Sequence, residues 1–284
     1  MARAYPLERR DQDFYFLNLG VSAFKSDMAS MELPIFSLRK NMDSEPWEWK
    51  SVDGSKTLTV LSTELYGRAT MFDKELLIYA LGCMAMQLNR EKSMGKTIRF
   101  SAYSYFLATN KKTSGGNYNK LEQALNRLST TSLQTNVVTG DHEIKSFFHL
   151  VEKARMYFID GKMRGVEIEL SDWLFDSLNS LNILTIHPEY FNLTSSLERR
   201  IYEMAKKHCG KQGVWTMKLQ NFKAKTGSRS SDREFKRMLV EIAKKGRIPE
   251  YRLMLNGGVV NIYQTDPKAQ KKVVKSLAKK VVDK

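Results

Sequence analysis

The chain has 284 residues, enough for two domains of about 150 residues each. Hydrophobic residues make up 42% and charged residues 27%, which excludes collagen-like, disulfide-rich and wholly disordered chains. The net charge of +15 lies in the last third, because residues 1–190 hold equal numbers of basic and acidic side chains. Such a basic segment predicts a polyanionic partner, most often nucleic acid; a solvated charged surface is the alternative.

The two cysteines give no sign of a metal site or a disulfide framework. Cys83 and Cys209 belong to no C-x-x-C motif and stand apart from any group of histidines, so neither structure is expected. No stretch approaches the ~18 consecutive apolar residues of a membrane span. We therefore expect a cytoplasmic protein with no metal, no cofactor and no membrane partner.

The chain begins with a segment of little regularity. Residues 1–55 contain Pro6, Pro34 and Pro46, three of the six prolines, and are predicted to form an irregular arm. Beyond it, residues 57–62 alternate as a strand, and a helix follows Asp73 with apolar residues at helical spacing.

A helix-turn-helix comes next. After a strand at 97–100, Ser101 is a plausible N-cap for a helix to residue 108, and the polar turn 109–119 leads to a second helix at 118–128. One stripe of that second helix is apolar, so its other side can face outward. Further strands are predicted at 132–138, 147–158 and 166–170.

The same order of elements recurs after residue 190. A helix at 197–208 and a strand at 215–219 precede two helices, at 221–226 and 232–245, and a hairpin with its turn at Gly257–Gly258. The predicted fold class is therefore α+β, with two tandem winged-helix domains; two unrelated α+β domains are the alternative. The predicted divisions are an arm at 1–55, a first winged helix at 56–190, a second, basic one at 191–265, and a basic amphipathic C-terminal helix at 266–284.

Motifs for catalysis are sparse. Gly95-Lys96-Thr97 ends like a P-loop but lacks the first glycine, since Arg90 stands there. The four histidines form no H-x-H pair of the kind that rolling-circle nicking enzymes use. A tyrosine recombinase needs Arg, His and Tyr side chains that folding brings together, and with 12 tyrosines the sequence alone does not exclude such a site. We expect a protein that is not an enzyme and has no catalytic residues.

Residues suited to DNA cluster at the two predicted recognition helices, whose N-terminal turns would offer donors to phosphates and base edges. In the first domain these residues are Lys111, Lys112, Thr113, Ser114, Asn117, Asn119 and Lys120. In the second they are Lys223, Lys225, Ser228, Arg229, Ser230, Ser231, Arg233, Lys236 and Arg237. Arg229, Arg233 and Arg237 are the predicted base contacts, because a guanidinium can bind guanine bidentately. A solvent-exposed polar turn is the alternative at both places.

Five sequence blocks resemble the replication initiator protein A family of bacterial plasmids, which is related in architecture to iteron-binding initiators with two winged helices. They are SMELPIFSL at 30–38, ATMFDKELLIY at 69–79, ATN at 108–110 with Gly115-Gly116, LSDWL at 170–174, and LERRIYEMAKKHCG at 197–210. The resemblance covers roughly residues 14–255. One departure is Leu33, where the family usually has His.

The resemblance implies a plasmid or phage-plasmid replication initiator. Such a protein would bind repeated sites in double-stranded origin DNA, help to open the duplex, and recruit the host initiator and replicative helicase. It also implies a switch between a monomer that initiates and a homodimer that represses its own promoter, and a nucleoid- or plasmid-associated location in a bacterium. The alternatives are a winged-helix transcriptional regulator without replication activity, and a DNA nicking or recombinase enzyme.

Overall fold

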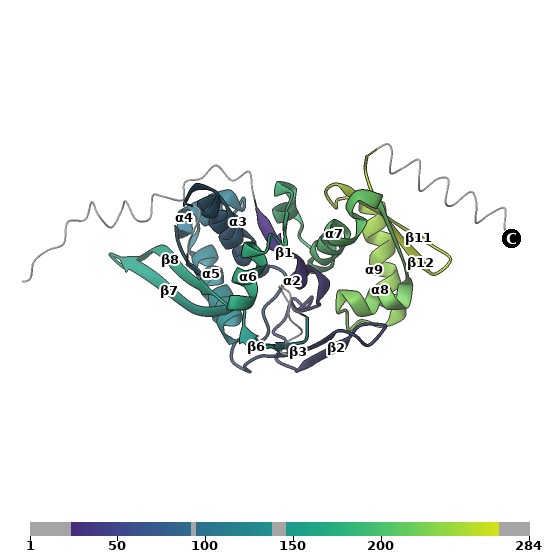
Figure 1. The fold of residues 1–284 in the computed structure, drawn as a ribbon, viewed down its shortest axis with the longest axis horizontal. Coiled ribbons are helices and arrows are strands. Elements are labelled where there is room, and N and C mark those ends of the chain that lie inside the picture. The colour runs from purple at the N-terminus through teal and green to yellow at the C-terminus, as the bar shows by residue number, and fades with distance from the viewer. Residues whose placement is uncertain (1–23, 92–94, 138–145, 267–284) are drawn as a thin grey trace, which may run out of the picture.

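The computed structural model describes residues 24–91, 95–137 and 146–266 as a mixture of helices and antiparallel sheets (Figure 1). Two series of elements follow one another along the chain, one on either side of the molecule in this view, with β1 (Lys25–Asp27) and α2 (Met28–Glu32) between them. The predicted C-terminal helix beyond residue 266 and the predicted arm before residue 24 lie outside the described residues.

The first series runs helix, strand, helix, helix, hairpin. Its members are α3 (Lys74–Glu91), β4 (Thr97–Ser101), α4 (Ala102–Ala108), α5 (Gly115–Thr130), β7 (Val151–Ile159) and β8 (Lys162–Leu170). The strands form one antiparallel sheet in the order β4-β8-β7. Ser101 caps α4 as predicted, since its hydroxyl accepts a hydrogen bond from the Ser104 amide at 2.9 Å.

The second series repeats this topology. It consists of α7 (Ser196–Cys209), β10 (Val214–Lys218), α8 (Leu219–Thr226), α9 (Asp232–Lys245), β11 (Tyr251–Asn256) and β12 (Val259–Gln264). Its strand order is β10-β12-β11, which matches the order β4-β8-β7 of the first sheet: in each sheet the last strand of the hairpin lies in the middle. Gly257 and Gly258 both have positive φ, 55° and 77°, as a tight two-residue hairpin turn requires.

A third, four-stranded sheet departs from the predicted strands. Its order is β2-β3-β5-β6, from Trp47–Lys50, Thr57–Leu61, Ser132–Thr135 and Ser146–His149. The strand predicted at 147–158 is two strands: β6 pairs with β5, whereas β7 pairs with β8. Leu150 between them is fully buried. The alternation of apolar and polar residues continues from β6 into β7, so the sequence does not show that the chain passes from one sheet to another.

The arm predicted to be irregular at 1–55 contains order within its described part. It forms β1, α2 and β2, and residues 29–37, from within α2 onward, are all buried. Residues enclosed on every side show no periodicity, which is why the pattern was absent from the sequence. The remaining elements are α6 (Asp172–Asn179), β9 (Ile183–Thr185), which pairs with β1, and two short 3-10 helices, η1 (Pro188–Asn192) and η2 (Gly210–Gln212).

The two series share one continuous hydrophobic core. Buried ion pairs cross between them, from Lys74 on α3 to Glu203 on α7 and from Arg199 on α7 to Glu75 on α3. Within the described ranges, every helix falls short of the length and apolar character that crossing a bilayer requires. The same ranges contain no group of three or more His, Cys, Asp or Glu placed to hold a metal ion.

Candidate nucleic-acid interface

Helix α9 separates an apolar face from a cationic one. Phe235, Leu239 and Ile242 are buried against the second series. The N-cap is Ser231, whose hydroxyl accepts a hydrogen bond from the Glu234 amide at 3.3 Å, and this fixes where the helix begins. The opposite face is exposed and carries Arg233, Lys236, Arg237 and Lys244. Four cations on one open helix face form a surface suited to phosphates.

The cations of this face differ in how strongly they are engaged. Arg237 is held by two carboxylates of its own helix, Glu234 at 2.6 Å and Glu241, and the hydrogen bond with Glu234, together with both charges, raises the pKa of Arg237. Arg233 and Lys236 have no ion-pair partner in the part of the chain that the structure describes. Both are therefore open to an external anion, whereas Arg237 is already paired.

Two predicted DNA-contacting cations are placed elsewhere. Lys225 points to Glu32, with its Nζ 2.5 Å from Oε1. Arg229 lies 3.3 Å from the Asp43 carboxylate, also contacts Glu45, and stacks over the Trp47 ring with its Cζ 5.0 Å from the centroid. The sequence predicts both as DNA contacts, and in the structure both form ion pairs with carboxylates of the N-terminal segment. Composition cannot distinguish a lysine facing solvent from one facing a distant carboxylate.

The rest of the predicted set in this region surrounds the start of α9. Lys223 pairs with Asp232 at 2.6 Å. Ser228 and Ser230 share a hydrogen bond of 2.8 Å in the turn. These residues gather at the N-terminal end of α9, as the spacing predicts, and their contacts order the turn that leads into the helix.

Helix α5 presents a similar but weaker surface. Leu121, Ala124, Leu125 and Leu128 are buried. Lys112, Thr113 and Ser114 before the helix, and Asn119 and Lys120 within it, are exposed, and Asn117 is half-buried, donating a 2.7 Å hydrogen bond to the Lys112 carbonyl. Six of the seven residues predicted here therefore reach the surface together at the start of α5.

Lys111 is the exception in the first set. Its ammonium group pairs with the fully buried carboxylate of Glu75, which also pairs with Arg199 of the second series. Lys111 keeps 27% of its side chain exposed. It therefore connects the surface next to α5 with the buried contact between α3 and α7.

Sequence reasoning missed the cations of the first hairpin. Lys162 and Arg164 are exposed on β8, near the turn at Asp160 and Gly161, and β7 of the same hairpin packs against α5. Both residues precede the strand predicted at 166–170, and no role is predicted for them from the sequence. Both α5 and α9 keep an exposed polar side. Each helix lies next to a hairpin of its own series (Figure 1).

A known protein family and a similar protein match this chain in sequence. Residues 25–253 match the model of a family described as "Replication initiator protein A". A protein of Wigglesworthia glossinidia brevipalpis named "Putative replication protein" is 33% identical over 241 residues, which are 83% of this chain and 86% of that protein.

Solved structures share the fold at low sequence identity. The crystal structure of domains 2 and 3 of RctB, as a selenomethionine derivative, superposes with a TM-score of 0.60 at 13% identity, covering 85% of this chain and 99% of that one. A second structure of RctB domains 2–3 gives 0.55 at 12% identity, over 82% and 95% of the two chains. The family match spans nearly all of the described residues, and the chain belongs to the replication initiator protein A family.

Proposed function

We propose that this protein initiates replication of a plasmid or phage-plasmid by binding repeated sites in double-stranded origin DNA. Each series of elements would act as a winged helix, with α5 and α9 entering successive major grooves of one duplex. The observation that carries this proposal is the exposed row of Arg233, Lys236 and Arg237 on α9, opposite its buried stripe. Family membership supports replication as the process.

The two helices would contribute unequally. Lysines and arginines would position the protein on phosphates, while Arg233 and Arg237 would read base edges. Helix α9 carries more exposed cations than α5, so it would supply most of the affinity. Lys162 and Arg164 on the hairpin beside α5 would add contacts to the backbone. Distortion of the flanking DNA would then help the duplex to open.

The proposal requires no catalytic step. Binding, duplex opening, and recruitment of a host initiator and helicase need surfaces rather than a reacting group. Repression of its own promoter by a homodimer would use the same DNA-binding helices. A regulator that lacks replication activity would bind DNA equally well, so the two functions are separated only by a replication assay.

The test has two stages. Selection from a random duplex library, together with gel-shift titration of fragments flanking the encoding gene, should yield one sequence that recurs as direct repeats beside the gene. A plasmid carrying the gene and these repeats, without another origin, should then be maintained in a bacterial host. Failure to select any sequence would overturn the DNA-binding proposal, and specific binding with repression but without maintenance would favour a regulator. Nicked supercoiled plasmid after incubation with magnesium would instead show an enzyme.

A further inference from the structure

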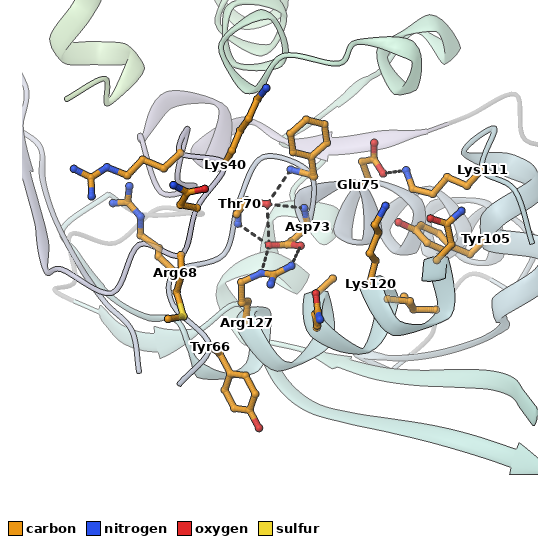
Figure 2. A pocket seen from close by; sticks show the side chains of 18 of the residues that line it. Lys40, Tyr66, Arg68, Thr70, Asp73, Glu75, Tyr105, Lys111, Lys120 and Arg127 are labelled. Carbon is orange, nitrogen blue, oxygen red and sulfur yellow. Dashed lines mark hydrogen bonds and ion pairs between the residues drawn. The ribbon is translucent and has the colours of Figure 1, made fainter. Parts of the chain in front are cut away.

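A cleft of about 890 Å³ opens along one side of α5 (Figure 2). One wall is the segment at 39–42 with residues 65–72, and the other is α5 with the loop before it. Asp73, Glu75 and Tyr105 lie between the walls. The cleft therefore brings the N-terminal segment next to the helix that we propose to bind DNA.

The cleft carries excess positive charge. Six lysines and arginines line it against two carboxylates: Arg39, Lys40, Arg68, Lys111, Lys120 and Arg127 against Asp73 and Glu75. Both carboxylates are already neutralised from within the protein. Asp73 accepts two hydrogen bonds of 2.7 Å from Arg127, and Glu75 pairs with Lys111 and Arg199.

Two lysines of the cleft are left for an external anion. Lys40 and Lys120 are exposed, stand on opposite walls, and form no ion pair with the described part of the chain. In Figure 2 both extend their ammonium groups toward the same side of the cleft. Arg39 is half-exposed and lies 3.7 Å from Asp43 and 3.5 Å from Glu45, so both of its ion pairs are long.

The direction of the cleft follows that of the helix. Asn117, Lys120, Ala124 and Arg127 line it and, at intervals of three and four residues, form one row along the side of α5. Asn119 and Glu122, on the next row, are exposed. The major groove is about 12 Å wide and an α-helix has about the same diameter, so a helix inserted there has a DNA backbone along each side.

We propose that this cleft seats the sugar–phosphate backbone bordering the groove that α5 enters, and that Lys40, from the N-terminal segment, contacts its phosphates opposite Lys120. This inference rests on the proposed DNA-binding function and adds a second wall to that surface. Asn117 and Gln123 line the cleft together with the two lysines, a mixture of amides and cations typical of backbone contacts. An acidic protein segment is the competing occupant, and the test includes it.

The first experiment compares Lys40→Ala, Lys120→Ala and the double variant with wild type in binding to the duplex selected by wild type and to a scrambled duplex. Each single variant should weaken binding to both duplexes by roughly threefold to tenfold and reduce the slope of log K against log salt by about 1, and the double variant by about 2. Lys25→Ala removes a half-buried lysine on β1, outside the cleft, whose ammonium group donates a 2.7 Å hydrogen bond to the Thr185 hydroxyl, and should leave the slope unchanged.

The results separate this inference from the proposed function. If wild type selects no sequence, the function itself fails. If wild type binds its site and the Lys40 and Lys120 variants keep both affinity and salt slope, the cleft does not hold DNA and the inference is overturned. Binding of poly-glutamate that depends on Lys40, together with unchanged DNA binding, would identify an acidic protein segment as the occupant and would overturn it equally.

A second experiment locates the DNA directly. Both native cysteines are buried, and burial raises the pKa of each thiol to about 12, so a cysteine introduced by Lys40→Cys should be the thiol that reacts with an iron chelate. The bound chelate should cut the selected duplex at a few adjacent sugars bordering one protected segment. Cutting spread evenly along the duplex, or none in a complex that still forms, would contradict the proposed place of Lys40.

Discussion

Lys74 Nζ, at the first residue of α3, lies 2.6 Å from Glu203 Oε2 on α7, and both side chains are buried. The next residue of α3, Glu75, pairs with Arg199, one turn earlier on α7. The hydroxyl of Tyr190 donates a further hydrogen bond of 2.8 Å to Glu203. Two ion pairs thus join α3 and α7, the first helices of the two series; α3 supplies the cation of one pair and the carboxylate of the other. Because this junction holds the two series together, it also fixes the separation between α5 and α9.

Breaking this junction should destabilise the whole protein. In Glu203→Gln, Lys74 would stay buried without a countercharge, so the free energy of unfolding should fall by about 3–5 kcal/mol. Urea denaturation followed by circular dichroism measures it. Glu241→Gln is the matched control, because Glu241 pairs with Arg237 on the exposed face of α9 and should change stability by less than about 0.5 kcal/mol. If both substitutions lowered the free energy of unfolding by the same amount, the buried junction would stabilise the protein no more than a surface ion pair does.

The outer face of α9 should carry sequence-specific affinity. Arg233→Ala removes an exposed guanidinium that has no ion-pair partner among the described residues. It should cost about 1–3 kcal/mol of binding to the selected duplex, with a smaller cost on a scrambled one. Arg237→Ala should cost less, because Arg237 must first leave Glu234 and Glu241. Gel-shift titration at fixed salt measures both. Unchanged affinity in the double variant, with an unchanged melting temperature, would exclude α9 as the recognition helix.

Arg229 should matter for stability more than for DNA. Asp43 is buried and is contacted by Arg68 at 3.0 Å as well as by Arg229, and burial lowers the pKa of Arg68 to about 10. Arg229→Ala should lower the free energy of unfolding by about 1–3 kcal/mol, because Asp43 loses a partner and Trp47 loses a stacked cation. Its effect on DNA affinity should be smaller than that of Arg233→Ala. A larger loss of DNA affinity in Arg229→Ala than in Arg233→Ala would show that Arg229 contacts DNA.

The cluster around Glu32 should make stability depend on pH. Burial alone would raise the pKa of Glu32, but the hydrogen bond with His208 and the charges of Lys207 and Lys225 outweigh it and hold the pKa well below the ordinary value of 4.5. Below pH 4.5 the unfolded chain takes up a proton at Glu32 that the folded chain does not, so this stabilisation is full above that pH and is lost as the pH falls.

Denaturation of wild type and Glu32→Gln at a series of pH values checks this dependence. The variant should be less stable at neutral pH, and the difference in unfolding free energy should narrow as the pH is lowered from about 5 to about 3. A difference that is constant or widens over that interval would mean that Glu32 is not held ionised by its neighbours.

Local signals in the sequence were sufficient for much of the second series. The apolar spacing of Phe235, Met238, Leu239 and Ile242 predicts both the helix and its buried side, and Gly257–Gly258 predicts the hairpin turn. Both are confirmed, except that Met238 is only half-buried. These features depend on residues within a few positions of one another, which is the range over which periodicity and turn chemistry operate.

Features that depend on distant residues were not predictable. The pairing of Lys225 with Glu32 and of Arg229 with Asp43 joins residues separated by 193 and 186 positions, and no local pattern marks such partners. Lys40 stands in a segment with no periodicity, so only the fold shows that it faces α5 across a cleft. The assignment of DNA contacts to both helices stays a prediction.

We propose that α5 and α9 are held at a fixed separation and bind one duplex together. Gel-shift titration on the selected site, with about 5 base pairs or about 10 base pairs inserted between its two hydroxyl-radical-protected segments, tests it most directly. We expect the half-turn insertion to rotate one segment to the far side of the duplex and to reduce affinity to the non-specific level, with partial recovery or none at the full turn. Equal affinity for the original and half-turn sites would contradict it.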